Sequence, residues 1–194
     1  MNPTRGGTGR RPRVPGLLRR RTLLLATLAA AAGRAHASPA PPEVTAALPG
    51  AVLVGSGRLR FLGMVIYDAR LWAAVPFGPG ADYADVPLAL ELQYARRLVG
   101  RLIAERSVDE MRRVGEFDDA QARQWLSRMA AIFPDVGAGD RITGVQRPRE
   151  AVRFFVNGRD AGELPDPEFT RLFFGIWLAP QTSQPQLRDA LLGR

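Results

Sequence analysis

The sequence predicts an α+β fold in which a largely antiparallel sheet is covered on one face by helices. Strand patterns begin at about residue 51, helical patterns follow, and a second set of strands precedes the last helices. Residues 88–95, LALELQYA, alternate apolar and polar side chains as a half-buried strand does. Residues 118–133 instead repeat apolar side chains along one helical face, at Ala122, Trp125, Leu126, Met129 and Phe133. The many apolar residues of both layers favour an interface with room for an apolar ligand.

The first elements of the domain form a hairpin. Residues 51–62 and 63–74 are predicted strands joined by a tight turn at Leu62-Gly63. Gly55 and Gly57 allow a bulge or a close backbone approach in the first of them. The polar segment PFGPGADYADVP then predicts a loop before the strand of residues 88–95.

Two helices and a second hairpin follow. Residues 98–114 have helical apolar spacing, and Asp118 is a good cap for the next helix. Residues 140–145 and 151–156 are the predicted strands of the hairpin, and Asn157-Gly158 marks the turn into a further short strand.

Two helices close the chain. Asp166 opens a helix that runs to Leu178, and residues 184–192 form the last one. The pattern contains no repeat and no second domain, so residues 51–194 are expected to fold as one unit, preceded by a Pro-rich extended arm at residues 38–50.

The positive charge of the chain is confined to its N-terminal segment. The net charge is +8, but residues 1–37 contain eight arginines and no acidic residue. Subtracting these eight from the 27 basic residues leaves 19, which equals the 19 acidic residues. The region after residue 37 therefore has no net charge, and a nucleic-acid partner is not expected.

Residues 1–37 have the organisation of an export signal. Arg19-Arg20-Arg21 precedes the apolar run TLLLATLAAAA, which is too short for an ordinary membrane-spanning helix. Ala35-His36-Ala37 then forms a small-x-small cleavage site before Ser38. The order RRTLLL resembles a twin-arginine signal. We expect cleavage near Ala37-Ser38, a periplasmic or secreted protein, and membrane contact only transiently through the signal; the alternative is an uncleaved, membrane-anchored N-terminus.

The composition excludes several kinds of chemistry. The chain has no cysteine and no lysine, and its one histidine, His36, lies in the predicted signal. Ser-His-Asp and Cys-His catalysis, Schiff-base formation and disulfides are therefore excluded from the processed protein. A metal site is not expected, because histidine and cysteine supply nearly all structural zinc sites. No cofactor is expected either.

The first hairpin supplies the candidate ligand-binding residues. Arg58 and Arg60 share one face of their strand, and a guanidinium in a sheet–helix cleft binds a carboxylate or enolate in bidentate fashion. The alternative for them is a solvated face or ion pairs with Asp68 and Glu91. Tyr67 is a candidate donor to the same ligand oxygen, or else a core aromatic residue. Which arginine points inward is left open, because one bulge reverses the parity of a strand.

The other charged groups have structural interpretations. Asp68 and Arg70 lie two apart on one strand face, which predicts a salt bridge between them. Asp109-Glu110 and Asp118-Asp119 are interpreted as acids at helix starts. A solvated helix face is predicted for the basic set of Arg96, Arg97, Arg101, Arg106, Arg112 and Arg113.

Three segments resemble the bacterial chalcone isomerase-like proteins. They are GSGRLRFLGMVIYDARLW at residues 55–72, FVNGRDAGELPDPEFTRLFFGIWL at residues 155–178, and LRDALLG at residues 187–193. The resemblance extends over residues 51–193. It implies an α+β fold described as an open-faced β-sandwich, a large antiparallel sheet covered by helices.

The resemblance also implies two functions. Plant chalcone isomerases close a chalcone into a flavanone without a cofactor, while other members of the fold bind fatty acids and hold the carboxylate with an arginine and a tyrosine. The family's cleft arginine falls on Arg58 or Arg60, its strand-two donor on Tyr67, and a Ser/Thr position on Thr170. The tyrosine and asparagine of the plant isomerases fall near Val99 and Arg106 and do not carry over.

We therefore expect the binding of a small amphipathic carboxylic acid of fatty-acid type, with Arg58 or Arg60, Tyr67 and Thr170 as ligand-binding residues. The alternative is a cofactor-free intramolecular isomerase or lyase for a phenolic or enone substrate, in which Thr170 is an added donor. A third possibility is a non-catalytic scaffold whose cleft is filled by its own side chains.

Overall fold

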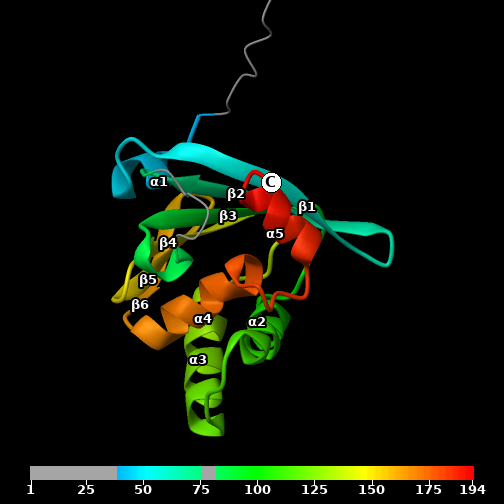
Figure 1. Ribbon diagram of the computed structural model, residues 1–194. Coiled ribbons are helices and arrows are strands. Elements are labelled where there is room, and N and C mark those ends of the chain that lie inside the picture. The colour runs from blue at the N-terminus through cyan, green and yellow to red at the C-terminus, as the bar shows by residue number, and fades with distance from the viewer. Residues whose placement is uncertain (1–38, 76–81) are drawn as a thin grey trace, which may run out of the picture. The chain divides into compact units, whose positions relative to one another are not determined.

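The computed structural model describes residues 39–75 and 82–194, and these form an α+β fold built on one sheet. The strands are antiparallel neighbours in chain order: β1 (Val52–Phe61), β2 (Met64–Ala73), β3 (Leu88–Tyr94), β4 (Arg141–Arg147), β5 (Ala151–Val156) and β6 (Arg159–Leu164). The helices are α1 (Pro42–Ala47), α2 (Gly100–Val114), α3 (Asp119–Ile132), α4 (Pro167–Leu178) and α5 (Pro185–Leu191), with a short 3-10 helix at Tyr83–Asp85. The predicted open antiparallel sheet covered by helices is confirmed (Figure 1).

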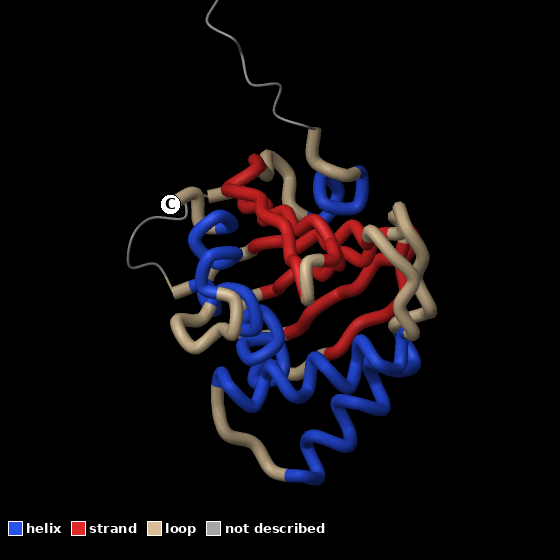
Figure 2. The backbone as a smooth tube through the Cα atoms, turned by 90° about the vertical axis from the view of Figure 1, so that its right-hand side faces the viewer, coloured by secondary structure: helices blue, strands red, loops and turns tan. Residues whose placement is uncertain are grey.

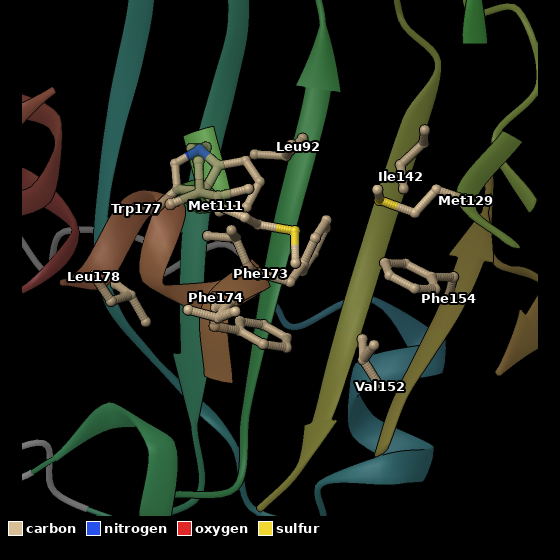
Figure 3. Packing of buried hydrophobic residues seen from close by; sticks show 14 of the residues in the cluster. Leu92, Met111, Met129, Ile142, Val152, Phe154, Phe173, Phe174, Trp177 and Leu178 are labelled. Atoms are coloured by element: carbon tan, nitrogen blue, oxygen red, sulfur yellow. The ribbon is translucent and has the colours of Figure 1, made fainter. Parts of the chain in front are cut away.

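The main core lies between one sheet face and the layer of α2, α3, α4 and α5 (Figure 2). Alternate strand residues such as Leu71, Leu90 and Phe154 point toward these helices and are almost completely buried. Helix α4 contributes Phe173 and Trp177, whose rings pack edge to face at 5.4 Å (Figure 3). This face carries the residues that enclose the candidate site.

The helix starts follow the predicted capping chemistry. Asp118 and Gln121 form a reciprocal capping box at the start of α3, and the Asp166 side chain accepts a hydrogen bond from the Phe169 amide at the start of α4. The interpretation of Asp109-Glu110 as helix-start acids is wrong, because α2 begins at Gly100 and continues through both residues to Val114. Glu110 is buried there and lines a cavity.

The opposite sheet face is partly covered by α1. The segment 38–50 was expected to be extended, but residues 42–47 are helical, with Pro42 in the first turn where its missing N–H costs nothing. Val44 is fully buried against Trp72 and Val145 in a second, smaller core. This segment is therefore part of the fold, because its apolar residues cover Trp72, which belongs to the second core and not to the main one.

Ion pairs follow the same face of the sheet. Arg70 Nη1 donates to Glu91 Oε1 at 2.9 Å, and Trp72 Nε1 donates to Glu91 Oε2 at 3.0 Å. Arg141 Nη2 likewise donates at 2.8 Å to Glu43 of α1. The predicted Asp68–Arg70 bridge is wrong, since each residue pairs across the sheet: Arg70 with Glu91, and Asp68 with a residue of β1.

Two hairpins use the same left-handed turn. In the β1–β2 turn, Leu62 has φ 49° and Gly63 has φ 78°, and in the β5–β6 turn Asn157 has φ 51° and Gly158 has φ 80°. Asn-Gly is the favoured pair for this geometry, while a leucine in the left-handed region is unfavourable. Both turns occur where the sequence predicts them.

Within residues 39–75 and 82–194, no helix combines the length and the apolar character needed to cross a bilayer. The export signal predicted for residues 1–37 lies outside the described residues.

Candidate ligand-binding cavity

A cavity of about 390 Å³ lies between the sheet and the layer of α2 and α4. This volume is within the range of small-molecule sites, which is roughly 300–1,000 Å³. Most of its lining is apolar: Leu59, Phe61, Ile66, Leu92, Leu98, Val99, Leu102, Ile103, Phe133, Ile142, Phe173, Ile176 and Trp177. The polar groups are fewer: Arg60, Tyr67, Tyr94, Arg106, Ser107, Glu110, Ser183 and Gln184. Such a lining suits an amphipathic molecule with one polar end.

A β-bulge decides which arginine reaches the cavity. Leu59 pairs with Tyr67, but the next residue, Arg60, pairs with Val65 rather than Ile66. Ile66 is therefore an extra residue on β2 and twists the end of the hairpin. As a result Leu59 and Arg60, although consecutive, both line the cavity.

Arg58 lies outside the cavity. Its Nε and Nη2 atoms donate to the two oxygens of Asp68 at 2.6 and 2.9 Å, and Asp68 lies on the sheet face opposite to Tyr67. The hydrogen bond from Arg58 holds the pKa of the Asp68 carboxyl below its usual value. This half-exposed pair matches the alternative weighed for Arg58 from the sequence.

Tyr67 is buried at the cavity wall. Its hydroxyl oxygen accepts a hydrogen bond from Trp177 Nε1 at 2.9 Å. Burial raises the pKa of this phenol well above its usual range, so it is neutral and keeps its proton. Because the indole nitrogen is a donor only, that proton is free to bond to a ligand oxygen. Tyr67 thus serves as both a core aromatic residue and a polar group of the cavity.

Tyr94 is a second neutral phenol at the cavity wall. Its ring meets that of Tyr67 edge to face, with centroids 5.9 Å apart. Burial, with a smaller effect of Tyr67, raises the pKa of the Tyr94 phenol. Tyr94 follows from the sequence only as a strand residue, and its place on the cavity depends on the packing of β3 against α2.

An ionic group on α2 completes the polar part of the cavity. Arg106 Nη2 donates to Glu110 Oε1 one helical turn away, and Arg113 Nε lies 3.5 Å from Glu110 Oε2. The side chain of Glu110 is buried, and its Oε2 has no hydrogen-bond partner among the residues that the structure describes. Arg106 is exposed, as expected for a solvated helix face, and it also lines the cavity. The Arg-x-x-x-Glu spacing beside Ile103 is the only trace of this pair in the sequence.

Thr170 lies away from this cavity. It is buried in α4 and its hydroxyl donates to the Asp166 carbonyl one turn earlier, at 2.8 Å. Thr170 instead lines a separate hollow of about 340 Å³, together with Asp85, Arg149 and Arg171. The structure thus brings Arg60 and Tyr67 together and separates both from Arg58 and Thr170.

The described residues contain no cluster of three or more histidine, cysteine, aspartate or glutamate side chains able to hold a metal ion. The polar lining of the cavity offers guanidinium, phenol, carboxylate, hydroxyl and amide groups. These groups bind and orient polar atoms through charge and hydrogen bonding.

The fold and the cavity define an α+β protein with an open antiparallel sheet and an internal apolar site beneath its helices. The chain belongs to the chalcone isomerase-like family, because the model of that family matches residues 52–193. The family expected from the three sequence segments is confirmed.

One known protein is similar to this chain in sequence, and one solved structure is similar to it in fold. An uncharacterized protein of Haemophilus influenzae is 30% identical over 108 residues, which are 56% of this chain and 52% of that protein. The chain thus spans about half the length of this curated relative. The crystal structure of a fatty-acid binding protein of Arabidopsis thaliana has a TM-score of 0.59 and 15% identity, and the match covers 74% of this chain and 87% of the other. At that identity the likeness is one of fold.

Proposed function

We propose that this protein binds an amphipathic carboxylic acid of fatty-acid type, with the carboxylate at Arg60 and Tyr67 and the tail in the apolar part of the cavity. The observation that carries the proposal is the placement of Arg60 and the neutral phenol of Tyr67 on the wall of a largely apolar cavity. The Arabidopsis thaliana relative by fold is itself described as a fatty-acid binding protein, which supports the same ligand class.

Arg60 is the anchor of the proposed site. Among the described residues it has no carboxylate partner within salt-bridge distance, whereas Arg58, two residues earlier, is paired with Asp68. A guanidinium without an acidic partner keeps its full fork of donors for a ligand carboxylate. Hydrogen bonds to charged groups each contribute about 1.5–3 kcal/mol.

Tyr67 supplies the second contact. Because Trp177 occupies one acceptor position of its oxygen, the phenol is oriented with its proton available to a ligand oxygen. The neutral form is maintained by burial, so this donor persists over the whole ordinary pH range.

The buried Glu110 would repel a ligand carboxylate, and Arg106 and Arg113 offset its charge. A ligand that also carries a hydroxyl would find an acceptor in this carboxylate. The three residues therefore leave room for a hydroxyl group beside the carboxylate end of the ligand.

An intramolecular isomerase remains the second candidate because plant chalcone isomerases share the family fold. Arg60 and Tyr67 would face a developing enolate as donors. Thr170 would not, because its hydroxyl already donates to Asp166 and lies outside the cavity.

We further propose that the chain is exported and processed near Ala37-Ser38. The basic segment, apolar run and small-x-small site of residues 1–37 support this. Expression in a bacterium, fractionation and N-terminal sequencing of the product test it. A periplasmic product that begins at Ser38 is expected, and an uncleaved chain in the membrane fraction would contradict it.

The ligand proposal is tested by displacement of a fluorescent fatty acid from the full-length chain. Arg60→Ala is expected to weaken binding by about tenfold or more, the loss of one charge-assisted contact. Arg58→Ala is the matched control, with the same side chain two residues away on β1, and should leave binding unchanged. Equal effects of the two variants, or no effect of Arg60→Ala, would contradict the proposal. Decay of chalcone absorbance above the spontaneous rate, lost in Arg60→Ala, would favour the isomerase.

A further inference from the structure

Exposed apolar side chains gather around the mouth of the cavity. In the part of the chain that the structure describes, five of the seven exposed large apolar residues are there, and we call them the apolar tip: Phe61, Leu62, Met64, Val99 and Leu102. Phe61, Val99 and Leu102 line the cavity itself, while Leu62 and Met64 are at the turn of the hairpin. Figure 1 shows this hairpin extending past α5.

Leu62 is the most exposed of them, at 81%. It has the backbone conformation that Asn157 has in the other left-handed turn, where asparagine is the favoured residue. The side chain of Leu62 is therefore not buried, and its left-handed backbone conformation is unfavourable for leucine. Neither turn geometry nor packing within the fold explains the leucine.

Arginines surround the apolar tip. Arg60 is next to Phe61 on β1, Arg96 Nη1 contacts Met64 Sδ at 2.9 Å, and Arg97, the next residue in the chain, is exposed. None of these three has a carboxylate within salt-bridge distance among the described residues, whereas Arg101 and Arg106 on α2 are paired with Glu105 and Glu110. The acidic residues of α2 thus neutralise the arginines of that helix. The three arginines on or next to the hairpin keep their positive charge.

We infer that the apolar tip is a docking surface for an anionic lipid bilayer. Exposed apolar side chains flanked by arginines are the combination that inserts at a membrane interface. Each arginine near an anionic surface contributes about 1 kcal/mol, and this contribution falls at high salt. Membrane contact was expected from the sequence only through the export signal, so the tip is a second and separate contact.

The position of the apolar tip at the mouth of the cavity links docking to ligand entry. Because Phe61, Val99 and Leu102 belong both to the tip and to the cavity lining, a docked protein opens its cavity toward the acyl layer. An apolar molecule would pass between the two without crossing water. The docking itself does not depend on which ligand the cavity takes.

Single-cysteine labelling of the full-length chain tests the inference, since the chain has no cysteine of its own. An environment-sensitive fluorophore is attached at Leu62→Cys and, as the matched control, at Val52→Cys. Val52 is also exposed on β1, but at the other end of the strand. With vesicles of phosphatidylglycerol and phosphatidylcholine, a blue shift and quenching by lipid-borne quenchers are expected at residue 62 and not at residue 52. The predicted signal at residues 1–37 is present in both proteins and cannot produce that difference.

Unlabelled variants give a second measurement. Leu62→Asn restores the favoured turn residue, so the fold is kept, and about tenfold weaker partitioning onto these vesicles is expected from the loss of one leucine. Val52→Asn should partition as the wild type does. Arg97→Gln should weaken binding and reduce its salt dependence, while Arg123→Gln, on the exposed face of α3, should not.

The inference is overturned if the label responds at neither position or equally at both, or if Leu62→Asn and Val52→Asn partition alike. It is also overturned if the wild type is a dimer that Leu62→Asn converts to a monomer, since the tip would then contact a second copy. Leu62 does not line the cavity, so Leu62→Asn should leave fatty-acid displacement without vesicles unchanged, and failure of the docking and failure of the proposed ligand site are distinguishable.

Discussion

Trp177 Nε1 donates a hydrogen bond to Tyr67 Oη across 2.9 Å and thereby joins α4 to β2 at the cavity wall. The two residues are 110 positions apart in the chain. Both side chains are buried, so each polar atom depends on the other for a partner. This bond fixes the direction of the Tyr67 proton and links the stability of the core to the chemistry of the cavity.

Replacing Tyr67 by phenylalanine is expected to affect both properties. Ligand affinity should fall about tenfold because a donor to a charged oxygen is lost, and the free energy of unfolding should fall by about 1–3 kcal/mol because Trp177 Nε1 loses its acceptor. Displacement of a fluorescent fatty acid and urea unfolding measure the two. Tyr94→Phe is the control for stability, since the described residues offer its hydroxyl no hydrogen-bond partner. An equal loss of stability in both variants would contradict the role of the Trp177 bond.

The tyrosines predict an unusual alkaline titration. The chain has three tyrosines, Tyr67, Tyr83 and Tyr94, and burial is the main cause that raises the pKa of each. Their folded-state pKa values exceed the unfolded value of about 10, so the stability they contribute is complete below about pH 10 and is lost as the pH rises further. For the buried Tyr67 and Tyr94, tyrosinate absorbance should therefore appear only together with loss of near-ultraviolet circular dichroism. Ionisation of either of these two phenols near pH 10 in the intact fold would contradict this, and Tyr67→Phe should reduce the pH dependence.

The Arg58–Asp68 pair predicts a small loss of folding stability at acidic pH. The hydrogen bond from Arg58, followed by smaller effects that include the charges of Arg58, Arg70 and Arg60, lowers the pKa of Asp68. The stabilisation is present above the unfolded carboxyl pKa of about 3.9 and is lost as the pH falls through the lower folded value. Because the pair is half-exposed, its contribution should be at most about 1 kcal/mol. Urea unfolding at a series of acidic pH values should show less pH dependence in Arg58→Ala than in Arg60→Ala; the reverse order would contradict the pairing.

Helix α1 is predicted to be needed for full stability. Val44 is completely buried against Trp72, so Val44→Asp places a charge in an apolar contact and should lower the free energy of unfolding by about 3 kcal/mol. Ala46→Asp introduces the same charge on the exposed face of α1 and should change stability by less than about 0.5 kcal/mol. Urea unfolding compares the two. If Val44→Asp were as stable as Ala46→Asp, α1 would not be docked.

The fold class and most elements could be predicted because they depend on local patterns. Alternation marked residues 88–95, Asp118 and Asp166 marked helix starts, and Asn157-Gly158 marked a turn, and each signal acts within a few residues. The prediction of an extended arm was wrong for a non-local reason. Residues 42–47 are helical because they pack against Trp72 and Val145 of the sheet.

The candidate site could likewise be predicted only in part from the sequence. The residue types alone indicated Arg60 and Tyr67 as polar groups beside an apolar layer, and they excluded histidine and cysteine chemistry. The strand pattern was compatible with either Arg58 or Arg60 on the cavity, and it did not indicate Arg106 or Glu110 there.

The sequence by itself thus determined the layers of the fold, the family and the kinds of chemical group available, since these follow from composition, periodicity and short motifs. Only the tertiary structure decided which groups meet. The bulge at Ile66 turns Arg60 toward the cavity, Asp68 neutralises Arg58 on the other face, and the packing of α4 on β2 brings Trp177 to Tyr67. The physical reason is that a bulge interrupts the regular alternation of side chains where two strands pair, and its position depends on cross-strand pairing rather than on nearby sequence.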